Sequence, residues 1–284
     1  MKVLITGAGG MVGRLLAEHC RSLGDEVEAF DHAGLDITDE RAVRQAFAGA
    51  RPDAAVNCAA WTDVDACELD PQGAFLVNSQ GVEILATASR LAGTAFLTIS
   101  TDYVFDGRRE GHFYTQRDDP HPLSAYGASK LEGERRAQAA YARTVVVRSG
   151  WIFGPGGKNF LATALERARR GERLRAISDS YGTPTYAADL AARLRELTRL
   201  DLPGVYHVVN SGDGASYEDF ARAAVEAAGA NGFEIESILT DSLRRQAPRP
   251  RNSRLRCLLS KAIGLRPLRH WREALGEFAS RAAP

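Results

Sequence analysis

Apolar and polar positions follow two alternating rhythms over the first 150 residues of the chain. Short apolar and β-branched runs predict five strands, at Lys2–Thr6, Glu26–Phe30, Ala54–Asn57, Ala95–Ser100 and Thr144–Arg148. Stretches with helical spacing of apolar residues lie between them, at Val12–Leu23, Glu40–Ala48, Pro71–Leu91 and Tyr126–Ala139. Such alternation is typical of parallel βαβ units. The pattern therefore predicts an α/β fold, a Rossmann-type doubly wound parallel sheet.

The rhythm changes after about Gly150. Three helices are expected at Phe160–Gly171, Ala187–Leu200 and Tyr217–Ala228, with a strand at Gly204–Val209. The segment Arg244–Arg256 is rich in arginine and proline, which predicts a basic loop. We therefore predict a Rossmann domain over residues 1–150, to whose sheet the chain later returns, and a smaller mixed α/β lobe over residues 151–284.

Composition excludes several classes of protein. The formal net charge is +0 over 284 residues, so the molecule as a whole would not steer nucleic acid or an anionic membrane towards itself. No apolar run approaches the roughly 20 residues that span a bilayer. The four cysteines show neither a CxxC pair nor metal-ligand spacing, which predicts reduced thiols in a cytoplasmic protein.

The first predicted strand runs into the glycine-rich stretch TGAGGMVG. The first glycine allows a tight turn, a mid-loop glycine lets the backbone approach a pyrophosphate, and the last lets the helix pack closely on the strand. Backbone N–H groups and the helix dipole would then favour phosphates. A turn without a ligand is the alternative, but the strand–helix junction favours dinucleotide binding. The predicted residues are Gly7, Gly9, Gly10, Met11, Val12 and Gly13.

Acidic residues after the second predicted strand bear on the choice of dinucleotide. Asp31 lies about 20 residues past the glycines, where a carboxylate accepts both ribose hydroxyls of NAD and repels a 2′-phosphate. His32 beside it would soften that repulsion, so the sequence favours NADH and leaves NADPH open. Asp36 and Ile37 are predicted beside the adenine, with a helix-entry cap as an equal alternative for Asp36.

Small residues follow the third predicted strand. Cys58, Ala59 and Ala60 would let the backbone lie against the ribose and phosphates of the dinucleotide. A tight turn chosen for packing is the alternative, but the carboxyl end of a parallel strand favours a ligand.

Three polar residues are candidates for proton transfer. Thr101 follows the fourth predicted strand and offers a hydroxyl to a carbonyl oxygen, while Tyr126 and Lys130 share one helical face. A neighbouring ammonium and a nicotinamide positive charge would lower the phenol pKa from its usual value of about 10. The YxxxK pattern also arises by chance. With a dinucleotide loop upstream, it predicts that Tyr126 protonates the alkoxide, Thr101 orients the oxygen, and Lys130 also holds the nicotinamide ribose.

Together these motifs resemble the extended short-chain dehydrogenases/reductases. In finer detail the chain resembles the dTDP-4-dehydrorhamnose reductase family in LDITD, NCAAWTDVDACE, STDYVFDG, HPLSAYGASKLEGE, VVRSGWIFGPGGKNF, YGTPTYAADLA and PRPRNSRL. The resemblance implies a two-lobed enzyme that uses NADPH or NADH. It would reduce the C4 ketone of dTDP-4-dehydro-6-deoxy-L-mannose to dTDP-L-rhamnose, with Thr101, Tyr126 and Lys130 as its catalytic set.

The resemblance also assigns the second lobe to a dTDP-sugar substrate. Trp151 would set an aromatic face against the deoxysugar, with a core tryptophan as the alternative. Guanidinium forks match phosphate geometry, so Arg249–Arg254 suits a diphosphate, whereas any single arginine could equally be a solvated surface charge. The predicted substrate-binding residues are Thr62, Val64, Thr101, Asp102, Tyr103, Trp151, Asn159, Arg251 and Asn252.

Some members of the resembled family pair through carboxylates that share a magnesium ion at a dimer interface. Here Arg14 follows the glycine loop and is a poor metal ligand, and the helix after GTPTY supplies one acid, Asp189. We therefore predict no metal site, do not expect magnesium, and leave the oligomeric state open between monomer and homodimer.

Other functions stay open. A related nucleotide-sugar 4-ketoreductase or C4 epimerase would use the same threonine, tyrosine and lysine, although an epimerase shows no net turnover of its NAD. A 4,6-dehydratase would carry an Asp–Glu pair after the threonine, whereas Asp102 and Tyr103 follow Thr101 here. A non-catalytic regulatory subunit of a methionine adenosyltransferase also resembles this family, but would need no intact catalytic set.

Overall fold

The computed structural model describes residues 1–156, 161, 163–164, 167, 170, 172–229 and 234–282. Within them, a six-stranded parallel sheet has the order β10-β5-β4-β3-β1-β2. The strands are β1 (Lys2–Thr6), β2 (Glu26–Phe30), β3 (Ala54–Asn57), β4 (Ala95–Thr101), β5 (Val145–Ser149) and β10 (Gly204–His207). Each lies within two residues of its predicted bounds.

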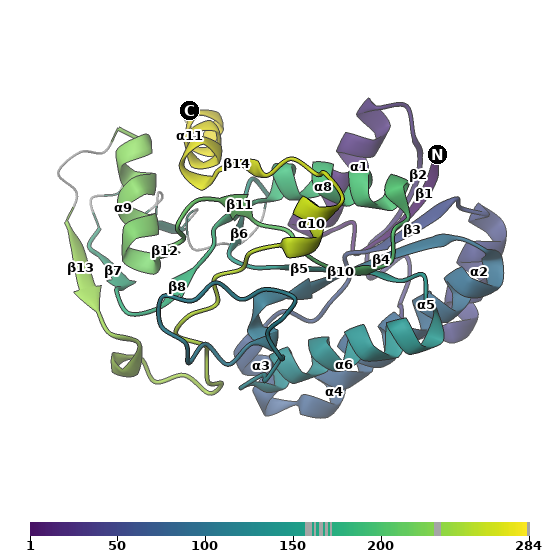
Figure 1. Cartoon of the computed structure of the whole chain (residues 1–284), viewed down its shortest axis with the longest axis horizontal. Coiled ribbons are helices and arrows are strands. Elements are labelled where there is room, and N and C mark those ends of the chain that lie inside the picture. The colour runs from purple at the N-terminus through teal and green to yellow at the C-terminus, as the bar shows by residue number, and fades with distance from the viewer. Residues whose placement is uncertain are drawn as a thin grey trace.

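Helices cover both faces of this sheet (Figure 1). Those on one face are α1 (Met11–Ser22) and α8 (Ala187–Leu200); those on the other are α2 (Glu40–Ala50), α5 (Gly81–Ala92) and α6 (Ala125–Ala140). Successive strand side chains point to opposite faces, so Val3 and Ile5 pack with α1 and α8 while Leu4 packs with α2 and α5. Burial on both faces explains the continuous apolar run in β1. The Rossmann-type prediction is confirmed.

The predicted single helix Pro71–Leu91 is divided by a π-helical turn. The parts are α4 (Pro71–Phe75), the turn η1 (Leu76–Gln80) and α5. Gly133 on α6 allows close approach here, because a Cβ on it would lie 2.1 Å from the Asn78 carbonyl oxygen. The Asn78 side chain accepts from the Trp61 amide at 2.8 Å and donates to its carbonyl at 3.0 Å. The π turn thus fixes the chain that follows β3.

In the later part of the chain, the described residues include short paired strands and further helices. The strands are β6 (Ile152–Phe153), β7 (Leu174–Ile177), β8 (Tyr181–Gly182), β9 (Thr185–Tyr186), β11 (Asn210–Ser211), β12 (Ala215–Ser216), β13 (Ile235–Ile238) and β14 (Leu268–His270). The helices are α9 (Tyr217–Ala227), α10 (Leu258–Ala262) and α11 (Trp271–Ala282). Figure 1 shows α9, α11 and β13 at the end of the molecule away from α2.

Several elements differ from expectation. The helices α3 (Val64–Leu69), α10 and α11 and the short turns η2 (Asp102–Val104) and η3 (Thr240–Ser242) were not predicted. Arg244–Arg256 contains no helix or strand, as predicted, and isolated bridges join it to Tyr114 and Tyr181. Most of the predicted helix Phe160–Gly171 lies outside the described residues. Because β10 and α8 belong to the main sheet layers, the domain boundary at residue 150 stays a prediction.

In the part of the chain that the structure describes, no helix has both the length and the apolar character that a bilayer crossing requires.

Candidate active site

Two adjoining cavities lie at the carboxyl edge of the sheet. They lie beside β1 and β3, the two adjacent strands between which the order of the strands changes direction. One, of about 570 Å³, extends from the glycine loop past the end of β4 to α6 and Trp151. The other, of about 520 Å³, extends from the same loop past the end of β2. They share Gly7, Gly9, Gly10, Cys58 and Ala60. A crevice at such a switch point is where open α/β sheets bind ligands.

The glycine loop is shaped for close approach of the backbone. Gly7 has a φ of +69°, and a Cβ on it would lie 2.5 Å from the Ala59 nitrogen. A Cβ on Gly13 would lie 2.4 Å from the Gly7 carbonyl oxygen. Gly10 begins α1 without a side-chain cap. The loop therefore presents bare backbone at a helix N-terminus, which fits the pyrophosphate of a dinucleotide. Met11 and Val12 also line the larger cavity.

The smaller cavity contains the residues predicted for the adenosine end. Asp31, His32, Asp36, Ile37 and Ala59 all line it. The Asp31 carboxylate accepts from the Gly34 amide at 2.8 Å. Asp36 accepts from the Thr38 amide and hydroxyl, which lowers the pKa of its carboxyl, and the N-cap of α2 is Asp39. The helix-cap alternative for Asp36 is therefore wrong.

Tyr126 and Lys130 both face the end of β4. A hydrogen bond joins the Tyr126 and Thr101 side chains, and Lys130 Nζ donates to the Ile99 carbonyl at 2.7 Å. Ser124 caps α6 by accepting from the Gly127 amide at 3.2 Å. The larger cavity is lined by Thr101, Tyr126 and Lys130 together. The structure thus brings the three predicted proton-transfer residues to one place.

Burial dominates the electrostatics of the pair. It raises the pKa of Tyr126, and the side-chain hydrogen bond with Thr101 opposes this. It also lowers the pKa of Lys130 to about 8, while the charge of Glu134 opposes that fall. The lowering of the Tyr126 pKa that we expected from the ammonium does not prevail in this structure. Tyr126 is therefore held as a protonated phenol, the form that a proton donor requires.

Two residues that line this cavity each have a buried side-chain oxygen with no hydrogen-bond partner among the described residues. These atoms are Asp102 Oδ2 and Ser149 Oγ. Burial raises the pKa of Asp102 to about 6, while side-chain hydrogen bonds with Ser253 and Thr101 oppose this, the latter donated to Oδ1 at 3.1 Å. Buried polar groups normally find partners, so both atoms suit hydrogen bonds to a ligand. Ser149 was not predicted, although its place at the end of β5 is the signal that identified Thr101.

The predicted substrate residues Thr62, Val64, Tyr103 and Trp151 also line the larger cavity. Trp151 has a φ of +49°, an uncommon conformation that concentrates at functional sites. Its indole stacks on Tyr217, with ring centroids 3.8 Å apart. Sequence analysis missed Tyr217, which begins α9 far from any motif.

The arginine-rich loop is held by polar contacts with distant parts of the chain. Arg249 makes a two-pronged ion pair with Asp65, at 3.0 and 2.8 Å, and Arg251 pairs with Asp241 at 2.6 Å. The buried Asn252 amide donates to the Arg109 and His112 carbonyls at 2.6 and 2.7 Å.

The last three predicted substrate residues stay predictions. Arg251 and Asn252 are not among the described residues that line the two cavities. Asn159 lies outside the described residues.

Carboxylates elsewhere are engaged by arginine. Asp189 accepts from Arg269 at 2.9 and 3.0 Å, and Arg14 donates to Glu18 and to the Pro155 carbonyl. Over the described ranges, no three histidine, cysteine or acidic side chains lie together as metal ligands would. The absence of magnesium stays a prediction.

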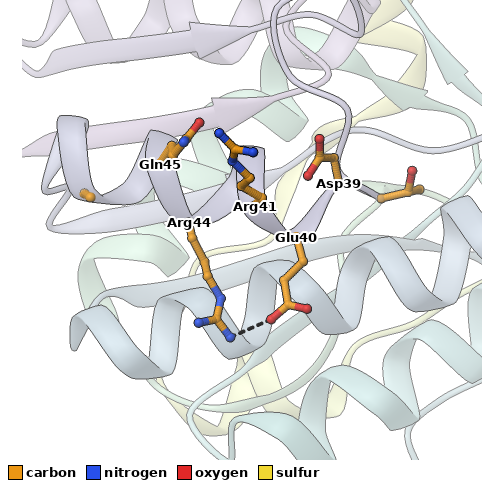
Figure 2. Close-up of a pocket in the computed structure, with 7 residues that line it drawn as sticks. Asp39, Glu40, Arg41, Arg44 and Gln45 are labelled. Atoms are coloured by element: carbon orange, nitrogen blue, oxygen red, sulfur yellow. Dashed lines mark hydrogen bonds and ion pairs between the residues drawn. The ribbon is translucent and has the colours of Figure 1, made fainter.

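A further hollow, on the outside of α2, has a polar lining (Figure 2). Arg44 and Glu40 pair across one helical turn at 2.5 Å, and Asp39 caps the helix. Such i, i+4 pairs are typical of a solvated helix face, so this hollow carries no candidate chemistry.

This chain is similar to known proteins in both sequence and structure. The model of the family described as "RmlD substrate binding domain" matches residues 1–283. The chain belongs to this family. A dTDP-4-dehydrorhamnose reductase of Streptomyces griseus is 40% identical over 280 residues, 96% of this chain and 91% of that protein. A probable dTDP-4,6-dihydroxy-2-methyloxan-3-one 4-ketoreductase of Streptomyces antibioticus is 37% identical over 279 residues, 98% of this chain and 94% of that protein.

This chain is also closely similar to solved structures. The dTDP-4-dehydrorhamnose reductase of Bacillus anthracis, in complex with NADP, superposes with a TM-score of 0.95 at 33% identity and covers 99% of both chains. The family resemblance predicted from the sequence is therefore confirmed.

Proposed function

We propose that this chain reduces the C4 ketone of dTDP-4-dehydro-6-deoxy-L-mannose to dTDP-L-rhamnose with NADH or NADPH. The observation that carries the proposal is the convergence of Thr101, Tyr126 and Lys130 on the cavity that the glycine loop also lines. Reductases of this activity are among the relatives that match nearly the whole chain. When bound along the glycine loop, the dinucleotide supplies the hydride that reduces the carbonyl carbon.

Proton transfer to the substrate oxygen is assigned to Tyr126. Reduction of a ketone to an alcohol takes one hydride at carbon and one proton at oxygen. The Tyr126 phenol gives that proton, and the Thr101 hydroxyl, which is hydrogen-bonded to it, orients the oxygen. The Lys130 ammonium stabilises the phenolate that forms. Solvent protons then restore the phenol.

Sugar recognition is assigned to the far side of the cavity. Asp102 Oδ2 and Ser149 Oγ offer hydrogen bonds to the sugar or to the nicotinamide amide. Trp151 offers an apolar face to the deoxysugar methyl group. Thr62, Val64 and Tyr103 complete this wall, and the resemblance adds Asn159, Arg251 and Asn252 as predicted contacts.

For the dinucleotide, we infer a preference for NADH. Asp31 lines the smaller cavity, where its carboxylate would accept from ribose hydroxyls and repel a 2′-phosphate. The Bacillus anthracis relative in complex with NADP argues for NADPH, and His32 beside Asp31 would reduce the repulsion. The preference is therefore one of degree.

The test is to follow the absorbance of reduced nicotinamide with the 4-keto sugar nucleotide and either dinucleotide. Consumption with dTDP-L-rhamnose as product supports the proposal, and faster turnover with NADH supports the role of Asp31. The Streptomyces antibioticus relative favours a second candidate, reduction of another dTDP-4-keto sugar, so a panel of such sugars belongs in the assay. Interconversion of C4 epimers without net consumption would indicate an epimerase. Dinucleotide binding without turnover of any sugar would contradict the proposal and favour a regulatory subunit.

A further inference from the structure

Three side chains on one face of α6 meet three consecutive residues of β4. Tyr126, Lys130 and Glu134 are spaced i, i+4 and i+8, so they lie along one line of the helix. Tyr126 bonds Thr101, and Lys130 bonds the Ile99 carbonyl. Glu134 accepts a hydrogen bond from the hydroxyl of the residue between these two, Ser100. The proton-transfer pair is thus the first two members of a line of three, and the third has no role in the proposed reaction.

Glu134 is fixed from two strands. Its side chain is 3% exposed and that of Arg148, on β5, is 7% exposed. Arg148 Nε lies 3.0 and 3.2 Å from the two carboxylate oxygens, and Nη2 lies 2.7 Å from one of them. Arg148 is paired in register with Ser100, so both partners of Glu134 come from adjacent strands. The carboxylate cannot turn away from α6 without breaking these contacts.

Stability alone is a weak reason for this ion pair. Two charges lose their hydration when they are buried, and a well-packed apolar pair often serves the fold equally well or better. We therefore looked for a functional reason for the buried Glu134 charge, and the neighbouring residue that it affects electrostatically is Lys130. Lys130 is 5% exposed, and burial favours its neutral form. The Glu134 charge one turn later opposes that effect.

We propose that Glu134 is a positioning residue that keeps Lys130 as an ammonium in the wall of the dinucleotide cavity, while Arg148 and Ser100 hold the carboxylate in place. The inference rests on the proposed roles of Tyr126 and Lys130. It goes beyond them by assigning a function to a residue that neither cavity exposes.

Other titratable groups surround this cluster. Cys58, beyond β3, lies near Lys130, but burial raises the pKa of its thiol to about 12, so it stays neutral over the range of the test. Asp102, after β4, faces Tyr126. His207, on β10, faces Arg148 and has its pKa lowered to about 3 by burial and by that arginine, so it stays neutral over the range of the test.

The test compares Glu134→Gln with Glu132→Gln, which removes the same charge from the exposed side of the same helix, where Glu132 pairs with Arg136. Turnover and NADH affinity are measured from about pH 6 to about pH 9. An ammonium is present below its pKa and lost above it, so both quantities should fall on the alkaline side. In Glu134→Gln this fall should move about one pH unit lower, the usual effect of one nearby charge. The loss is then several-fold near pH 8 and small near pH 6, while Glu132→Gln matches the unmodified protein.

A purely structural role gives a different result. It predicts equal losses at every pH and recovery in the double variant Glu134→Gln/Arg148→Met, which leaves no unpaired buried charge. On our proposal, the double variant regains thermal stability, but its turnover and NADH affinity still fall at the lower pH seen in Glu134→Gln. An unmoved limb in both variants overturns the proposal. If Glu134→Gln does not fold, the double variant carries the test.

Failure of the proposed reductase function can be distinguished from failure of the role proposed for Glu134. If the unmodified protein reduces no sugar, the reductase proposal falls. The pH dependence of NADH affinity, measured by its fluorescence, still decides the role of Glu134. A limb in NADH affinity that Glu134→Gln leaves unmoved would overturn that role on its own.

Discussion

The edge of the main sheet and the second lobe place their functional residues by different means. At the sheet edge, most such residues follow a strand within a few positions, as Gly7 follows β1, Asp31 follows β2 and Thr101 ends β4, and a helix of regular spacing, α6, supplies Tyr126 and Lys130. In the second lobe, contacts between segments far apart in sequence decide position. Asp65 and Arg249, for example, are 184 residues apart. Periodicity locates the first kind of residue, whereas only the folded chain reveals the second.

The largest expected effect concerns the sheet edge itself. Tyr126→Phe removes the proposed proton donor and leaves the ring, so turnover should fall by at least about 10²-fold. Dinucleotide affinity should change little, because the glycine loop is untouched. Tyr141→Phe, at the other end of α6, is the control and should retain full turnover. Near-normal turnover of Tyr126→Phe in a steady-state assay would remove this residue from the mechanism.

A smaller effect is expected in the glycine loop. Gly7→Ala combines a positive φ with a Cβ 2.5 Å from backbone, so NADH affinity should fall about tenfold, the scale of 1–3 kcal/mol of local strain. Gly24→Ala is a matched control, since Gly24 also has a positive φ but open space around its Cβ position. It should lower the melting temperature without changing NADH affinity in a fluorescence titration. Equal affinity losses in both variants would show that strain alone, not the cradle, is responsible.

The second lobe has its own close-packed glycine. A Cβ on Gly182 would lie 2.0 Å from Nε1 of Trp151, whose ring stacks on Tyr217. Gly182→Ala must therefore move the indole, and the KM for the sugar nucleotide should rise several-fold while NADH affinity is kept. Gly276→Ala, in open space on α11, should change neither. If Gly182→Ala weakened NADH instead, Trp151 would belong to the cofactor side and the comparison of regions would fail.

These two glycines also show what the sequence could reveal. Gly7 lies in a motif whose spacing has a physical meaning, so its role was predictable. Gly182 depends on an indole 31 positions earlier in the chain, and Tyr217 on a stacking contact across the lobe, neither of which leaves a periodic signal. The six main strands were predicted nearly to the residue, because burial on both faces imposes continuous apolar runs. The short strands β6 to β9 hold two to four residues each and have no such pattern.

Asp102 and Asn252 show a limit of another kind. Both were predicted as substrate contacts from the resemblance. Asp102 lines the cavity with one oxygen free of protein partners, whereas Asn252 is buried with its amide on two backbone carbonyls. Sequence alone does not distinguish a polar residue whose side chain is available to bind a ligand from one whose side chain stabilises a loop through hydrogen bonds. The difference depends on whether the fold brings unsatisfied backbone carbonyls next to the side chain, as it does for Asn252.

The smallest expected effect tests the long-range contacts of the second lobe. The Arg249 guanidinium, assisted by the Ala247 amide, lowers the pKa of Asp65 from its usual 3.8 to about 2. A carboxyl with a lowered folded pKa stabilises the protein above its unfolded pKa, and that contribution disappears as pH falls from about 4 to about 2. Asp65→Asn should therefore lower the melting temperature by about 1–2 °C near pH 6, since the pair is partly exposed. The difference from the unmodified protein should vanish near pH 2. Asp241→Asn breaks the exposed pair with Arg251 and should shift the melting temperature less than Asp65→Asn near pH 6, because Asp241 is 80% exposed. Equal shifts of the melting temperature in the two variants would mean that the Asp65–Arg249 ion pair contributes no more than an ordinary surface pair. The Arg244–Arg256 loop would then be positioned by Asn252 instead.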